Sequence, residues 1–280
     1  MVLGRCSAVA GVGSGGAEWG GWVHALITND DGIGSPGLVA LAAAAARAGL
    51  STTTAAPATE ASGTGASLTT AADHHRVPFE EHPSGYALPA HPGLITLIAA
   101  RGGFGPVPEI VLSGINLGAN LGRAIIHSGT VGAALTAGVV GIRAVAFSLD
   151  TGFVDGQVHW ETAASVFDDV FAIVADTPPG SMFNVNVPNV PVDELRGIRW
   201  ARLAEFGSVQ SVIERLEDGT ISVTTVETDA EPAPDTDAAL LAAGYVTVTA
   251  IRSVHEDPVL HGAISIPPRW PARRPPCGRG

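Results

Sequence analysis

The pattern of hydrophobic and polar residues in the first part of the chain is first that of a strand, then that of a helix and then that of a strand again. A short apolar run at residues 24–28 stops at turn residues, which is typical of a buried strand. Ser35 and Pro36 follow as a helix N-cap and first helical position, and the alanine-rich run after them predicts a helix that ends at Gly49. A threonine-rich run at residues 50–56 predicts a second strand. This βαβ unit indicates a parallel sheet with a right-handed crossover.

The alternation of strands and helices continues through the next hundred residues. Strands are predicted at residues 109–116, 144–150 and 182–188, and helices at 127–141 and 159–177. Such alternation favours an α/β fold, a doubly wound domain of three layers around a mainly parallel sheet. In such sheets ligands bind beyond the carboxyl ends of the strands.

The pattern changes beyond residue 200. Two alternating segments on either side of Asp218-Gly219 predict a projecting β-hairpin over about residues 208–228. Its apolar alternation indicates that it packs on something, and a second subunit is one candidate. A short helix at 236–244 and a final strand at 245–253 complete one folded domain, which we expect to span residues 23–266.

The two ends of the chain differ from this domain in composition. Residues 1–22 lack the continuous apolar centre of a secretory signal, so we expect a flexible leader. Residues 267–280 are rich in Pro and Arg, which predicts a disordered tail. Cys6 and Cys277 lie in these ends, so neither a disulfide framework nor a thiolate metal site is expected.

Charge and composition narrow the possible functions. The 280-residue chain has a net charge of -12, and an acidic surface repels the phosphates of a nucleic-acid polymer. All 15 basic residues are arginine, which excludes a Walker-type phosphate lysine and Schiff-base chemistry. No run of about 18 apolar residues predicts a membrane span. We therefore expect a cytoplasmic protein.

Four oxygen-bearing side chains follow the predicted parallel strands. Asp30 and Asp31 come directly after the first strand, Ser62 follows the second, and Asn116 ends a later one. Adjacent carboxylates repel each other unless a cation, a donor or solvent offsets their charge. Carboxylate, hydroxyl and amide oxygens suit a hard divalent cation such as Mg²⁺, which predicts a half-open metal site. The alternative is that Asp31-Gly32 is only a surface turn.

The start of the helix predicted after residue 127 is a candidate phosphate site. Ser128 is the expected N-cap, and the unpaired N–H groups at Ser128, Gly129 and Thr130 would favour an anion, with Asn116 beside them. Alternatively, Ser128 and Thr130 only cap the helix. His127 could donate to a phosphate or protonate a leaving alkoxide, or it could pack against the preceding loop. The glycine spacing of "GINLGANLG" lacks the core of a dinucleotide fingerprint.

Several longer sequence motifs resemble those of a known family. "TNDDGIGSPG", "SGINLGANLG", "HSGTVGAA", "NVNVP" and the late "TD" and "GYVTVT" resemble, in order and spacing, the SurE family of 5′/3′-nucleotidases over roughly residues 23–255. The resemblance implies a Rossmann-like domain in a homodimer or homotetramer built partly from exchanged carboxyl-terminal elements. It also implies a phosphomonoesterase that hydrolyses nucleoside monophosphates with a divalent cation, Mg²⁺ or Mn²⁺, through a metal-bound water. By motif match the metal ligands fall on Asp30, Asp31, Ser62 and Asn116.

The chain departs from the family pattern at three places. It has "ATEA" before Ser62, "AHPGLI" at residues 90–95, and Thr136-Ala137 where the family usually has Glu-Gly. None of these departures falls on the four expected ligands, but they bear on substrate choice and turnover. A metal-dependent nucleotide-binding protein with little turnover therefore stays an alternative. A phosphoaspartate enzyme would need an Asp-x-Asp pattern, and no motif indicates the donor-sugar pocket of a nucleotide-sugar transferase.

Overall fold

The computed structural model describes residues 23–70, 76–152, 156–205, 209–216, 218–227, 231–254 and 256. The expected leader and tail, with Cys6 and Cys277, lie outside the described residues. No helix in these ranges is long and apolar enough to cross a membrane.

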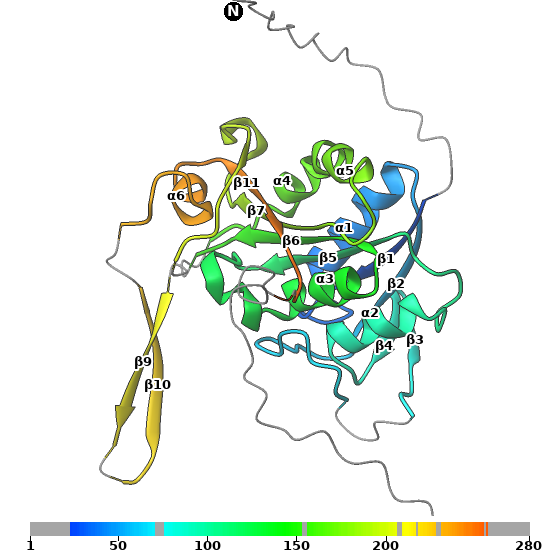
Figure 1. The fold of residues 1–280 in the computed structure, drawn as a ribbon, viewed down its shortest axis with the longest axis horizontal. Helices are drawn as coiled ribbons and strands as arrows, with labels where there is room; N and C mark the ends of the chain where they lie inside the picture. The colour runs from blue at the N-terminus through cyan, green and yellow to red at the C-terminus, as the bar shows by residue number, and fades with distance from the viewer. Residues whose placement is uncertain are drawn as a thin grey trace, which may run out of the picture.

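A nine-stranded sheet forms the centre of the protein, in the order β3-β4-β2-β1-β5-β6-β7-β11-β8 (Figure 1). From β4 to β7 every neighbouring pair is parallel, whereas β3 runs antiparallel to β4 and β11 antiparallel to β7. The predicted doubly wound α/β fold with a mainly parallel sheet is confirmed. The strands are β1 (His24–Thr28), β2 (Ser51–Pro57), β3 (Glu80–His82), β4 (Gly85–Leu88), β5 (Ile110–Leu117), β6 (Arg143–Asp150), β7 (Met182–Pro188), β8 (Ile198–Trp200) and β11 (Val246–Ile251).

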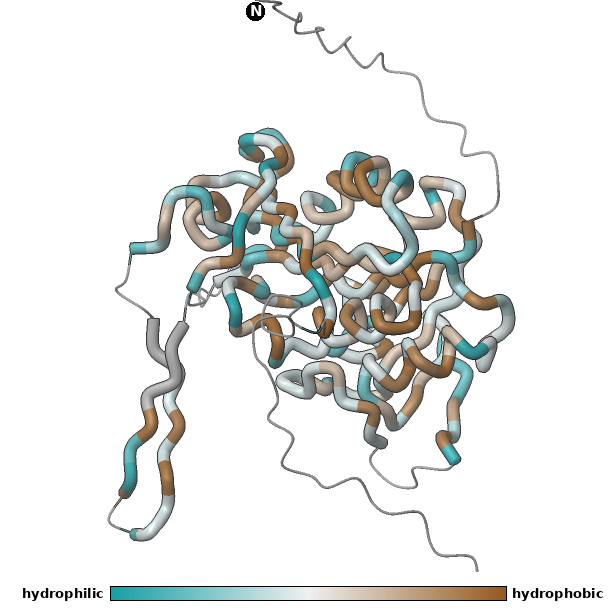
Figure 2. Tube along the Cα trace, in the orientation of Figure 1, coloured by the Kyte–Doolittle hydropathy of each residue, from teal (hydrophilic) through white to brown (hydrophobic). Residues whose placement is uncertain are grey.

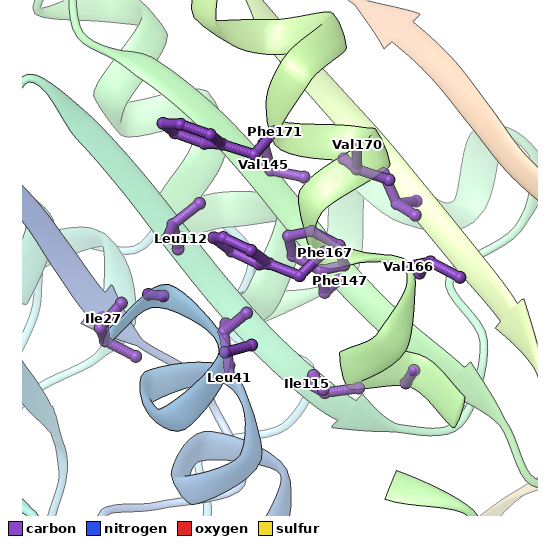
Figure 3. Packing of buried hydrophobic residues seen from close by; sticks show 14 of the residues in the cluster. Ile27, Leu41, Leu112, Ile115, Val145, Phe147, Val166, Phe167, Val170 and Phe171 are labelled. Carbon is purple, nitrogen blue, oxygen red and sulfur yellow. The ribbon is translucent and has the colours of Figure 1, made fainter. Parts of the chain in front are cut away.

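Helices cover both faces of this sheet and bury two apolar clusters. On one face α1 (Pro36–Arg47), α4 (Trp160–Ser165) and α5 (Phe167–Ala175) pack over the central strands. Figure 3 shows side chains of α1, β1, β5, β6 and α5 meeting in this layer. On the other face, α2 (Pro92–Ala100) and α3 (Gly129–Val139) cover the second cluster. The central strands β1, β5, β6 and β7 are buried on both faces, as expected for a parallel sheet.

Three stretches differ from the sequence-based expectation. The single amphipathic helix expected over 159–177 is wrong, because Val166 separates α4 from α5. Propensity does not reveal this break, since the apolar side chains on both sides of it join one core. No strand or helix is predicted between residues 57 and 108, yet this stretch contains β3, β4 and α2. A short 3-10 helix, η1 (Gly122–His127), precedes α3, and α6 (Asp237–Ala242) is the predicted short helix before β11.

The predicted hairpin is formed by β9 (Val209–Arg215) and β10 (Ile221–Glu227), which pair antiparallel. Asp218 closes its turn by accepting a hydrogen bond from the Thr220 N–H at 2.9 Å. The hairpin extends away from the sheet (Figure 1), and apolar and polar residues alternate in its outer part (Figure 2). Ile213 and Val223 are 70% and 66% exposed, so these two side chains have little cover within the described part of the chain.

Candidate active site

The strand ends bring three of the predicted site residues together. β1 and β5 are parallel neighbours with Thr28 opposite Ser113, so the residues that follow both strands reach the same edge of the sheet. The Thr130 hydroxyl at the start of α3 donates a hydrogen bond to Asp30 Oδ1 and lies 3.2 Å from Asn116 Oδ1. One threonine of α3 thus joins the end of β1 to the end of β5.

Asp30 is the buried carboxylate of the pair, with 3% of its surface exposed. Burial raises the pKa of Asp30 above its ordinary value of 3.8, because the charged form loses its hydration. The Thr130 hydroxyl and the N–H groups of Thr130 and Gly129 act in the opposite direction by donating to this carboxylate. The first N–H groups of α3 therefore face a protein carboxylate at the place where the sequence predicts a phosphate.

Asp31 lies nearer the surface than Asp30. Burial, then the neighbouring charge of Asp30, and then the charge of Glu60 raise the pKa of Asp31 to about 6. The Leu117 N–H donates to Asp31 Oδ2 at 3.3 Å and lowers this pKa. Two adjacent carboxylates with raised pKa values at one sheet edge are the kind of pair that marks a functional site.

The turn after β1 is built to hold the two carboxylates in place. Asn29 Nδ2 donates to the Gly32 carbonyl at 3.1 Å and to the Ser35 hydroxyl at 2.7 Å. Gly32 has a φ of +100°, a conformation that glycine adopts without the steric cost of a side chain. Ser35 in turn accepts from the Leu38 N–H at 3.2 Å and caps α1, as predicted. The turn is therefore tied to the first helix.

The loop after β2 reaches the same site. The Ala61 N–H donates to the main-chain carbonyl of Asp30 at 2.7 Å, and the Ser62 hydroxyl donates to Glu60 Oε1 at 2.8 Å. Glu60 is close enough to raise the pKa of Asp31. Ser62 thus lies in a loop that touches Asp30, and its hydroxyl is held by a carboxylate that the sequence analysis did not single out.

The start of α3 packs tightly against these elements. Ser128 caps the helix by accepting from the Val131 N–H at 3.2 Å, as predicted. A Cβ on Gly129 would come within 2.7 Å of Asp30 Oδ2, and a Cβ on Gly132 within 2.1 Å of the Gly65 carbonyl. Glycine at both positions lets the helix approach the aspartate and the loop after Ser62.

His127 directly precedes this helix start. His127 is exposed, and its main-chain carbonyl accepts a hydrogen bond from the Gly65 N–H at 3.0 Å. That hydrogen bond places the loop 62–65 beside the end of η1. A catalytic role for the imidazole stays a prediction.

The donor set is one of mixed oxygens. In the described part of the chain no group of three or more His, Cys, Asp and Glu side chains could hold a metal ion. A cation here would depend on the Asp30 and Asp31 carboxylates together with amide, hydroxyl and water oxygens. Mg²⁺ and Mn²⁺ accept such incomplete protein shells, so the residues present fit a hard divalent cation.

Comparison with known proteins places the chain in a family. The family model described as survival protein SurE matches residues 25–208. The chain belongs to the SurE family. A 5′/3′-nucleotidase SurE from Cronobacter sakazakii is 33% identical over 250 residues, covering 88% of this chain and 95% of the relative. The enzyme of that name from Erwinia tasmaniensis is 34% identical over 252 residues, with the same shares covered.

A solved structure agrees with the fold. The crystal structure of the SurE protein from Aquifex aeolicus superposes with a TM-score of 0.73 at 28% identity, covering 86% of this chain and 98% of that one. The resemblance noted in the sequence motifs is thereby confirmed, and so is the α/β Rossmann-like fold expected of the SurE family.

Proposed function

We propose that this protein is a 5′-nucleotidase-type phosphomonoesterase that hydrolyses nucleoside monophosphates with the help of one divalent cation. The adjacent pair Asp30 and Asp31 carries this proposal, because burial raises the pKa of both carboxyls at the edge where a parallel sheet binds its ligand. The names of the relatives from Cronobacter sakazakii and Erwinia tasmaniensis support the reaction class.

Four residues would hold the cation. Asp30 and Asp31 supply carboxylate oxygens, Asn116 supplies its amide oxygen, and Ser62 supplies a hydroxyl after it leaves Glu60. When bound, Mg²⁺ or Mn²⁺ supplies Lewis-acid polarisation of a phosphoryl oxygen and makes a water more acidic. The Thr130 hydroxyl orients both Asp30 and Asn116, since it reaches both side chains.

The start of α3 would bind the substrate phosphate. Ser128, Gly129 and Thr130 form the first turn of the helix, whose N-terminal dipole favours an anion. Gly129 lets the helix start pack directly against Asp30, which places this carboxylate beside the proposed phosphate site. His127 is exposed beside the turn, and we assign it the transfer of a proton to the leaving alkoxide.

The departures from the family pattern do not fall on the residues proposed to hold the cation or the phosphate. Thr136 lies two turns into α3, where its hydroxyl donates to the Gly132 carbonyl at 2.8 Å. His91 directly precedes α2, and its side chain makes no capping hydrogen bond. No observation specifically supports the alternative, a nucleotide-binding protein with little turnover. Measuring phosphate release distinguishes that alternative from an enzyme.

The oligomeric state and cellular location belong to the same proposal. We infer a homodimer or homotetramer, because the exposed side chains of Ile213, Ile221 and Val223 in the β9–β10 hairpin would gain cover from a second subunit. A cytoplasmic location agrees with the acidic net charge of -12 but rests on the sequence alone.

The experiment that tests the function measures phosphate release from AMP, GMP and an aryl phosphate. Wild type is assayed with MnCl₂, with MgCl₂ and with a chelator, and Asp30→Asn is assayed with MnCl₂. The proposal requires cation-dependent release by wild type and a loss of at least about a hundredfold in Asp30→Asn, in the range expected when a group that positions a catalytic cation is removed. Equal activity of the two proteins would overturn the metal assignment.

A further inference from the structure

The loop between Asn116 and η1 is held at its far end by side chains of β6 and β7. The Asn120 N–H donates to Asn186 Oδ1 at 2.8 Å, and the Asn120 carbonyl accepts from Asn186 Nδ2 at 2.9 Å. Asn184 Nδ2 donates to the same carbonyl at 2.9 Å. Asn120 Nδ2 donates to the Ser148 hydroxyl at 2.8 Å. Four hydrogen bonds from three buried side chains therefore fix one residue.

The near end of the same loop makes the contacts of the candidate active site. Asn116 Nδ2 donates to the Gly118 carbonyl at 2.8 Å, which leaves Asn116 Oδ1 directed to the Thr130 hydroxyl. The next residue, Leu117, donates its N–H to Asp31. Only two residues, Gly118 and Ala119, separate Leu117 from Asn120. The Gly118 N–H donates to the Leu149 carbonyl at 2.9 Å, so this short stretch is held between β6 and the side chains that bind Asn120.

The two asparagines of β7 point away from the larger apolar cluster. Val185 and Val187 join that cluster, so Asn184 and Asn186 face the other side of the sheet by strand alternation. Both asparagines are fully buried, at 0% exposure. We call the hydrogen bonds of Asn184, Asn186 and Ser148 to Asn120 the Asn120 bracket. A buried amide that loses its partner cannot bind water instead, so breaking this bracket costs free energy.

We infer that Asn186 is a positioning residue of the active site, which fixes the loop 118–121 after β5 and through it the geometry of Asn116 and of the Leu117 N–H at the end of that strand. The Asn186 side chain binds both the N–H and the carbonyl of Asn120, in the way that the main chain of a neighbouring strand pairs with a residue. This inference rests on the proposed function for its catalytic consequence, whereas the fixing of the loop stands without it.

The chain contains a matched control for this role. Asn189 uses its amide in the same way on another loop: its Oδ1 accepts from the His159 N–H at 2.8 Å, and its Nδ2 donates to the Gln157 carbonyl at 2.9 Å. That loop leads into α4, and no hydrogen bond joins its described residues to Asp30, Asp31 or Asn116. Asn186→Leu and Asn189→Leu therefore remove the same kind of bracket, one at the site and one away from it.

The experiment compares wild type, Asn186→Leu, Asn189→Leu and Ser148→Ala. Amide hydrogen exchange of Leu117 reports the fixing of the loop, titration calorimetry with MnCl₂ reports the cation site, and kcat and KM for AMP report catalysis. We expect Asn186→Leu to lose protection at Leu117, to bind Mn²⁺ about tenfold or more weakly and to lose kcat by a similar factor. Asn189→Leu should match wild type in all three measurements.

The outcomes separate this inference from the proposed function. If wild type neither binds Mn²⁺ nor releases phosphate, the proposed function fails, and the exchange of Leu117 still tests the fixing of the loop. Unchanged Leu117 exchange and Mn²⁺ affinity in Asn186→Leu would overturn the inference. If that variant does not fold, Ser148→Ala removes one bond of the bracket and should show the same changes to a smaller extent, and wild-type values in Ser148→Ala would then overturn it.

Discussion

Replacing Gly129 with alanine tests how closely α3 approaches Asp30. A Cβ at residue 129 would lie 2.7 Å from Asp30 Oδ2, 2.8 Å from its Cβ and 3.1 Å from its Cγ. The aspartate is 3% exposed and is held by the Thr130 hydroxyl, so it has no free space into which to move. The added methyl group must therefore displace the carboxylate, the start of the helix or both.

The size of the effect follows from this overlap. Forcing one methyl group into a packed site typically costs about 1–3 kcal/mol. If Asp30 moves to relieve that strain, the affinity for the cation falls by a factor of ten for each ~1.4 kcal/mol of strain. We therefore expect Gly129→Ala to bind Mn²⁺ about 5- to 150-fold more weakly than wild type and to lose kcat/KM for AMP by a similar factor.

Gly34→Ala is the matched control for this substitution. Gly34 lies in the turn between Asp31 and α1, and a Cβ there meets no atom within 4 Å. Titration calorimetry with MnCl₂ and the AMP assay on both variants separate a steric effect on Asp30 from a general effect of adding a methyl group near the site. Wild-type Mn²⁺ affinity in Gly129→Ala would refute the reasoning.

Three further changes give distinct readouts. Without divalent cations the free energy of unfolding should fall as pH rises from about 4 to about 6, because folding raises the pKa of Asp31 from its ordinary 3.8 to about 6 and the folded state therefore holds the proton longer. Asp31→Asn should flatten this slope in chemical denaturation, and an unchanged slope would contradict the assignment. Thr130→Val removes the hydroxyl that donates to Asp30, so the pKa of Asp30 should rise further, seen in carboxyl ¹³C titration, and kcat/KM should fall about tenfold. Asp237→Ala leaves the Gly122 N–H without its buried acceptor, and should lower the free energy of unfolding by about 1–3 kcal/mol in urea titration.

The fold followed from the sequence where hydrophobic periodicity and turn chemistry agreed. The run at residues 182–188 and the N-cap pair Ser35 and Pro36 matched β7 and the start of α1. The break at Val166 could not be predicted, because Ala163 before it and Phe167 after it both join the same core and the segment contains no helix-breaking residue. Likewise, β3 owes its existence to pairing with β4, and its local sequence carries no strand pattern.

The candidate site followed from the sequence only in part. The rule that parallel strands end at one edge was enough to expect Asp30 and Asn116 near each other. The direct contact of Thr130 with Asp30 was not expected, because its sequence position at a helix start indicates capping or phosphate binding equally well. The bracket of Asn184 and Asn186 around Asn120 joins residues more than sixty positions apart, and alternation along a strand gives no sign of it.

The most direct test of the central claim is an anomalous difference map from crystals grown with MnCl₂. The claim is that the adjacent carboxylates after β1 hold a divalent cation. It predicts one strong manganese peak per chain, at about 2.0–2.4 Å from oxygens of Asp30 and Asp31 and beside the Asn116 amide. A manganese peak elsewhere, with the two aspartates bound only to Thr130, Leu117 and water, would contradict it.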